Sequence, residues 1–228
     1  MTEGLKFGFT SETFKWALIT PGLKSSLIIT VVLMIVVTIV GLRVKRLKAT
    51  DVPVGFTFIS IMFVQMVNNS TAEFFKKHWR TFTPYMLTIL LFLGVANTAS
   101  LFGLVPPLSD INVALGFSLL VFGSIQVSAL VIKKPLQRAK DLLEPNPAFL
   151  PINIIGEMST PFAMGLRLFG NLLSGSIIGI IVYGLTSWAG IIFGAFLLHP
   201  VFDIFFGLIQ AYVFFMLFSI FTSMAVED

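Results

Sequence analysis

Cysteine is absent from this chain of 228 residues, and charged residues are scarce. Without cysteine the chain forms no disulfide, offers no thiolate nucleophile and binds no zinc through sulfur. Charged side chains make up 11% of the sequence, whereas soluble proteins average about 25%. The hydrophobic fraction is 56% and the mean hydropathy is +0.95. A water-soluble chain of this size cannot bury so much apolar surface, so the sequence predicts a protein that lies in a lipid bilayer.

Long apolar runs predict an all-α integral membrane protein with one membrane domain, residues 1–228. About 20 apolar residues suffice for a helix to cross a hydrocarbon core of about 30 Å. Five spans are expected, and the last two are long and tilted; the fourth must tilt strongly, kink or begin outside the hydrocarbon. The predicted segments are an outer N-terminal segment 1–23, spans 24–42, 83–102, 113–132, 152–185 and 191–225, a cytoplasmic loop 133–151 and an outer turn 184–190.

Residues 52–80 are apolar at first and polar later, which is not the pattern of a simple span. Gln65, Asn68 and Asn69 interrupt the run, and basic residues end it. We interpret it as a helix in the cytoplasmic interface, lying on the membrane or re-entrant. The alternative is a true transmembrane helix. That alternative would place the basic residues at 133–140 outside, against the positive-inside rule.

The positions of the cations predict the orientation of the chain. Of the 15 Lys and Arg residues, 11 lie in clusters at 43–48, 76–80 and 133–140, and the connections at 103–112 and 184–190 carry none. Because cytoplasmic loops carry the excess of Lys and Arg, the N-terminus is expected outside and the C-terminus inside.

One cation breaks this pattern, because Arg167 lies deep within an apolar run. It is 15 residues from the start of the fourth predicted span and 18 from its end. A charge at this depth is unfavourable by at least about 2.5 kcal/mol and indicates a functional site. Among the neighbours on its helix face, Asn171 can form a hydrogen bond but brings no negative charge. We expect Arg167 to face a wet cavity or a carboxylate on another chain; the alternative is a structural ion pair.

Further polar residues fall at matching depths if the last two helices are antiparallel. Gln210 is assigned to the level of Arg167. Asp203 lies seven residues before Gln210 in the last helix and therefore on roughly the same face of that helix. Ser176 is then about 13 Å outward of Arg167 and Asp203 about 10 Å outward of Gln210, whereas Glu157 is about 15 Å inward. An acid on each side of a permanent cation fits two aqueous half-paths separated by a positive barrier.

Simpler interpretations of these residues stay open. Asp203 and Gln210 can be hydrogen-bonding contacts between helices, and Glu157 can be a solvated helix start. His199 precedes Pro200 and is a possible channel-lining residue, although a lone histidine is more often a packing residue.

Signatures of enzymatic chemistry are missing from the sequence. It contains no phosphate-binding glycine loop, no dinucleotide fingerprint, no nucleophile elbow and no cluster with metal-ligand spacing. We therefore expect no catalytic site, no cofactor, no metal and no nucleic-acid partner.

Several segments resemble one known family, subunit a of F-type ATP synthases. They are ANTASLFGLVP, SDINVALGFSL, PINIIGEMSTPFAMGLRLFGNLLSGS and QAYVFFML. The resemblance implies an ion-translocating stator in the membrane sector, with a c-subunit ring, b-type peripheral stalk subunits and the lipid bilayer as partners. It also implies that Arg167 faces the ring carboxylate, with Asn171 and Gln210 as its polar neighbours. Glu157 matches the family's acid on the cytoplasmic side.

The sequence departs from the family at the two outer-channel positions. Many members hold a Glu and a His there, whereas this chain has Ser176 and Asp203. The relay role is therefore expected of Asp203 more than of Ser176. The stretch between Glu157 and Arg167 is also about one helical turn shorter than in some members, which leaves their relative facing open.

Two other classes of function remain to be weighed against this one. A stand-alone channel or secondary transporter would hold its own binding site near the midplane. A structural membrane protein would leave the deep polar residues unexplained. The charge bias favours a bacterial plasma membrane.

Overall fold

The computed structural model describes residues 20–47, 53–75, 79–133 and 149–226, and the side chains of residue 183 and residues 185–199 lie outside the described part. Within these ranges the structure is helical and contains no strand. Five helices are long and apolar enough to cross a membrane. The predicted fold class, five spans and one additional helix, is confirmed.

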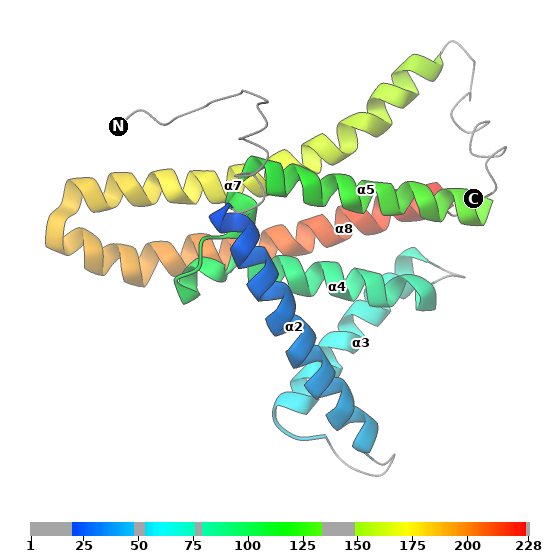
Figure 1. Cartoon of the computed structure of the whole chain (residues 1–228), viewed down its shortest axis with the longest axis horizontal. Coiled ribbons are helices and arrows are strands. Elements are labelled where there is room, and N and C mark those ends of the chain that lie inside the picture. Colours follow the sequence, from blue (N-terminus) through cyan, green and yellow to red (C-terminus); the bar gives the residue numbers. More distant parts are fainter. Residues whose placement is uncertain (1–19, 48–52, 76–78, 134–148, 227–228) are drawn as a thin grey trace.

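The helices follow one another along the chain, and two short 3-10 turns, η1 and η2, lie between α4 and α5 (Figure 1). Their bounds are α2 Pro21–Arg46, α3 Phe56–Phe74, α4 Trp79–Asn97, η1 Ala99–Phe102, η2 Pro107–Ser109, α5 Ile111–Lys133, α7 Leu150–Phe193, the π-helix η4 Gly194–Phe206, and α8 Gly207–Val226.

Helix α2 is longer at both ends than the predicted span 24–42, because its termini carry strong local signals. The Thr20 hydroxyl accepts a hydrogen bond of 3.3 Å from the Leu23 N–H, and Pro21 occupies the first turn. Both features favour a helix start. The last turn carries Arg43, Lys45 and Arg46, whose charges favour the carboxyl end of a helix.

Helix α4 begins earlier than the predicted span 83–102 and also ends earlier, at Asn97. It starts at Trp79, so Pro84 lies inside the helix and not in its first turn. After Asn97 the chain tightens into η1, and Gly103 ends that turn with a φ of 71°. A left-handed conformation of this kind favours glycine. The second span is therefore an α-helix followed by a 3-10 turn.

Helix α3 is the additional helix of the fold and does not qualify as a membrane span. It occupies 56–74 of the predicted 52–80; the basic residues 76–78, His78 among them, lie outside the described residues. Its carboxyl end is tied to the bundle, because the Ser223 hydroxyl donates a 2.8 Å hydrogen bond to the Phe74 carbonyl.

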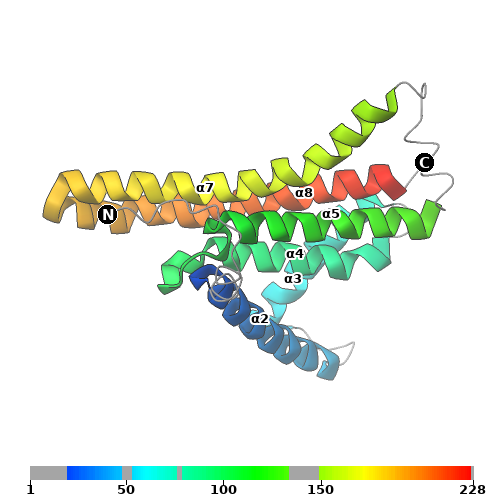
Figure 2. The same cartoon turned by 45° about the horizontal axis from the view of Figure 1, so that its top comes forward.

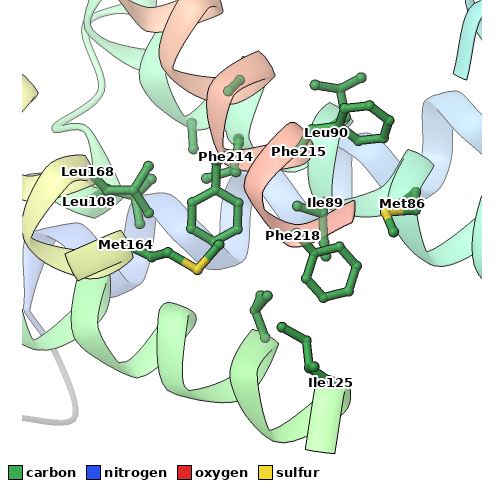
Figure 3. Packing of buried hydrophobic residues seen from close by; sticks show 14 of the residues in the cluster. Met86, Ile89, Leu90, Leu108, Ile125, Met164, Leu168, Phe214, Phe215 and Phe218 are labelled. Carbon is green, nitrogen blue, oxygen red and sulfur yellow. The ribbon is translucent and has the colours of Figure 1, made fainter. Parts of the chain in front are cut away.

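Helices α4, α5, α7 and α8 form the central bundle, and α2 leaves it at an oblique angle (Figures 1 and 2). The apolar side chains of α8, including Phe214 and Phe218, gather with those of α4, α5 and α7 (Figure 3). Met164 and Leu168 bring α7 into this core and are almost fully buried. By contrast, only 6% of the apolar window of α2 is buried within the chain.

Helix α7 has 44 residues and bends near its start. Pro161 lies inside it, and the first part of the helix turns away from the bundle in both views (Figures 1 and 2). A proline removes one helical hydrogen bond and pushes against the preceding turn, which accounts for the bend. Of the alternatives expected for a run of this length, the structure shows a kink.

The chain reverses direction beyond the ends of α4 and α5 and returns beside α7 as η4 and α8 (Figure 1). The sequence predicted a short turn at 184–190 between two separate helices. The chain does reverse here, but residues 184–190 are assigned to α7, which runs to Phe193, and Gly194–Phe206 form the π-helix η4 (Figure 1). No proline occurs from 184 to 190, so every residue there can donate a helical hydrogen bond.

Close packing between α5 and α7 depends on Gly165. A Cβ atom at this position would lie 2.6 Å from the Ser118 hydroxyl oxygen and 3.2 Å from the Leu115 Cα. The backbone of α5 therefore leaves no room for a side chain on α7 at this level. We expect Gly165→Ala to destabilise the protein by about 1–3 kcal/mol, the usual range for an overpacked core.

Thermal unfolding of the detergent-solubilised chain measures this effect. Gly123→Ala is the matched control, because a Cβ on Gly123 of α5 meets nothing within 4 Å. An equal melting temperature for Gly165→Ala and the control would contradict the tight helix contact.

Candidate functional site

Arg167 lies near the middle of α7 on a face that the other described residues leave uncovered. Its side chain is exposed, and its neighbour Leu166 is 49% exposed. Phe162 and Leu173 on the adjoining turns are also exposed. Among the described residues, the Arg167 guanidinium has no hydrogen bond and no ion pair. A permanent cation therefore stands on an apolar, membrane-depth surface with no partner in the described part of its own chain.

A first cavity, here called the Asp203 cavity, lies where α7 meets η4 and the turn after α4. Its volume is about 230 Å³. Three of the predicted site residues line it together: Asn171, Ser176 and Asp203. The Ser176 hydroxyl donates a 2.9 Å hydrogen bond to the Leu172 carbonyl of its own helix. The carboxylate of Asp203 is half-buried at this cavity.

A second cavity, here called the Glu157 cavity, lies between α5, α7 and α8 near the carboxyl end of α8. Its volume is about 290 Å³, and Glu157, Thr160 and Gln126 line it. The Gln126 side-chain N–H donates a 3.1 Å hydrogen bond to the Glu157 carboxylate. Sequence reasoning missed Gln126; its only signal was an amide within the third apolar run.

The contact between Gly175 and Phe202 sets the register of the antiparallel pair formed by α7 and the last helix. A Cβ on Gly175 would lie 3.5 Å from the Phe202 Cβ. Arg167 is eight residues before Gly175, and Gln210 is eight residues after Phe202. Equal numbers of residues in opposite directions bring Arg167 and Gln210 to roughly the same level, since only Phe202–Phe206 of this stretch are π-helical.

Arg167 stands between the two cavities along α7. Thr160 belongs to the Glu157 cavity and Asn171 to the Asp203 cavity. The 11 residues from one to the other span about 16 Å of helix. The side of this stretch that faces the helix bundle is closed by Met164 and Leu168, which are 2% and 0% exposed. A packed layer therefore separates the cavities at the level of the cation.

The π-helix bears on one expectation about the last helix. Asp203 lies within η4 and Gln210 within α8. A π-helix has more residues per turn than an α-helix. Seven residues across this junction therefore do not follow purely α-helical spacing, and a shared face for Asp203 and Gln210 stays a prediction. Asp203 lines its cavity, whereas Gln210 is buried.

Three buried polar atoms of α4, η1 and α8 have no hydrogen-bond partner among the described residues. The Asn97 side-chain N–H donates a 3.0 Å hydrogen bond to the Gly207 carbonyl. Among the described residues, the Asn97 Oδ1, the Ser100 Oγ and the Gln210 Nε2 are buried without a partner. Ser100 also lines the Asp203 cavity. Since unpaired buried polar atoms are unfavourable, these atoms can bind a small polar species such as water.

The side chain of His199 lies outside the described part of the structure, so its channel-lining role stays a prediction. Among the described residues, no group of three His, Cys, Asp or Glu side chains could hold a metal ion.

Comparison with known proteins connects this chain to one family. The family described as ATP synthase A chain matches residues 25–223. A relative in Psychromonas ingrahamii, ATP synthase subunit a, is 30% identical over 89% of this chain and 84% of its own length. ATP synthase subunit a 2 of Pelobacter propionicus is 30% identical over 72% of the chain and 71% of its length. A sodium ion specific ATP synthase subunit a of Propionigenium modestum is 28% identical over 76% of the chain and 61% of its length.

Proposed function

The chain belongs to the ATP synthase A chain family, and from this premise we propose that it is the stator that carries ions through the membrane sector of a rotary F-type ATP synthase. In this function it offers two offset half-channels to a ring of c subunits. The H⁺ or Na⁺ gradient across the membrane then drives rotation of the ring and synthesis of ATP. The chain itself has no catalytic site and serves as a subunit of the complex.

The exposed Arg167 is the observation that carries this proposal. Its neighbours on the uncovered face of α7 are apolar, and it has no partner among the described residues. A guanidinium in that setting is unfavourable unless a carboxylate from elsewhere pairs with it. The carboxylate of a c subunit, presented by a neighbouring helix in the membrane, meets this requirement. Asn171, one turn further along α7, and Gln210 supply neutral hydrogen-bonding groups beside the pair.

The Asp203 cavity serves as the outer half-channel in this mechanism. An ion enters past Asp203 and reaches the ring carboxylate, and for H⁺ the Asp203 carboxylate accepts the proton and passes it on. Ser176 lines the same route. Once loaded, the ring site is neutral and can turn away from the stator into lipid, because no charge has to enter the hydrocarbon.

The Glu157 cavity serves as the inner half-channel. After rotation the loaded ring site arrives beside this cavity and releases its ion toward Glu157 and the cytoplasm. The ring carboxylate is then negative, and Arg167 attracts it back to the stator. The same cation repels free cations in the packed layer, which prevents a direct leak between the cavities. The membrane potential contributes about 2.3 kcal/mol per charge for each 100 mV.

Orientation and assembly complete the proposal. The basic last turn of α2 supports a cytoplasmic end there, which puts the N-terminus outside and the C-terminus in the cytoplasm. We place the protein in a bacterial plasma membrane, where b-type peripheral stalk subunits hold it against the ring.

Disulfide cross-linking can test the docking of the ring on α7, because the chain has no cysteine of its own. We expect Leu173→Cys, on the exposed face beside Arg167, to cross-link to a cysteine placed next to the ion-binding carboxylate of a c subunit. The product is measured by gel electrophoresis of the assembled complex after mild oxidation.

Leu120→Cys on α5 is the control for this experiment. Leu120 is exposed but lines a different cavity, beside α2. It is expected to give no c-subunit product. Cross-linking at Leu120 and none at Leu173 would place the ring against α5 instead of α7 and contradict the proposal.

A further inference from the structure

Gln126 makes a contact that distinguishes it from Ser118 and Ser128 on the same helix. Ser118 and Ser128 donate hydrogen bonds to carbonyls of α5 itself, over 3.0 and 2.7 Å. Gln126 instead reaches across to α7 and donates to the Glu157 carboxylate at 3.1 Å. An amide in an apolar helix is unfavourable unless it is paired, so this contact gives the residue a reason to be there.

We propose that Gln126 is a positioning residue that holds the Glu157 carboxylate at the wall of its cavity, where the ion leaves the ring. This inference rests on the role proposed above for Glu157. Both side chains are half-buried and line the same cavity of about 290 Å³. The amide acts through Glu157 and does not itself carry the ion.

The bend in α7 explains why the carboxylate needs a partner from another helix. Pro161 is four residues after Glu157, so it lacks the N–H that would normally bond to the Glu157 carbonyl. The first part of α7 leaves the bundle at this point (Figure 2). A helix that lacks one of its own hydrogen bonds is less firmly held, and the contact from α5 fixes the position of the carboxylate.

The chemistry of an amide suits a carboxyl group that changes its protonation state. The Gln126 amide can donate its N–H to the ionised carboxylate, and its carbonyl oxygen can accept the proton of the neutral acid. A lysine or arginine at this position would pair only with the ionised form and would hold it there. A neutral partner therefore orients Glu157 in both states of the transport cycle.

The experiment compares Gln126→Met with the unchanged protein in the assembled complex. Methionine has a similar length but no hydrogen-bond donor for the carboxylate. We expect ATP-driven ion pumping in inverted membrane vesicles to fall roughly tenfold, the size of one hydrogen bond to a charged group. The amount of assembled complex should stay the same. Gln126→His, which keeps an N–H donor, should retain more activity than Gln126→Met.

Ser128→Ala is the matched control, since it removes a polar group from α5 that bonds only to its own helix in the described structure. It is expected to change pumping less than twofold. Normal pumping by Gln126→Met, or an equal loss in the Ser128 variant, would overturn the positioning role.

A double-mutant cycle separates this role from a merely structural one. If Gln126 acts through Glu157, then Gln126→Met should cause no further loss in a Glu157→Gln background. Additive losses would overturn the proposal and leave the function of the chain as stator intact. Normal pumping by Glu157→Gln alone would contradict the role of Glu157 and with it the role of Gln126. Failure of the stator function as a whole has a different signature, which is normal synthesis by the Arg167 variant described below.

Discussion

Replacing Arg167 with alanine is expected to lower ATP synthesis at least about 30-fold while the complex still assembles. Removing one partner of a desolvated charge pair costs about 2–5 kcal/mol, and each 1.36 kcal/mol corresponds to roughly tenfold in rate. Without the guanidinium, the ionised ring carboxylate has no partner at the stator. Assembly should persist because α7 packs into the core through the buried Met164 and Leu168, whereas the Arg167 side chain is exposed.

Synthesis is measured in membrane vesicles energised by an imposed ion gradient, and assembly by native gel electrophoresis. Arg43→Ala is the control, since this arginine lies in the basic last turn of α2 and ten other clustered cations remain to orient the chain. Normal synthesis by Arg167→Ala would remove the basis for assigning the chain as the ion-carrying stator. Loss of assembly together with synthesis would indicate a structural arginine instead.

Asp203→Asn is expected to slow ion flux through the membrane sector by about 100-fold, the lower end of what a positioned proton-transfer group contributes. Asparagine has nearly the same shape but carries no proton in a relay and no charge to attract a cation. The π-helix and the packing around the cavity should therefore remain. Passive flux through vesicles stripped of the catalytic sector measures the effect across a range of pH.

Asp110→Asn is the control, because it makes the same substitution of aspartate by asparagine away from the Asp203 cavity. Asp110 Oδ1 accepts a 2.9 Å hydrogen bond from the Asn112 N–H at the start of α5, and an asparagine can accept it equally well. Flux in this variant is expected to match that of the unchanged protein. If Asp203→Asn also leaves flux unchanged at every pH, the carboxylate has no part in the relay.

The spans could be predicted from the sequence because each one is set by a long-range property, the length of an apolar run. Their ends were less accurate, since they depend on local contacts. Thr20 extends α2 by capping it, and Pro84 is tolerated inside α4. The π-helix η4 had no counterpart in the prediction. Its hydrogen-bond pattern leaves no periodic signal that separates it from an α-helix in a uniformly apolar sequence.

The charged members of the site were predictable for a different reason. A charge in an apolar run stands out, so Arg167, Asp203 and Glu157 could be singled out and ordered by depth. Gln126 and Asn97 are neutral, and their importance depends on which helix they face. Only the packing of α5 against α7, and of α4 against the start of α8, brings them to the site.

The thin packed layer between the two cavities has an electrical consequence. If both cavities hold water and conduct, the membrane potential falls mainly across the layer of about 16 Å and not across the whole core of about 30 Å. The electric field at Arg167 is then nearly twice that of an undisturbed bilayer. The same voltage therefore exerts nearly twice the force on a charged ring site as it passes the stator.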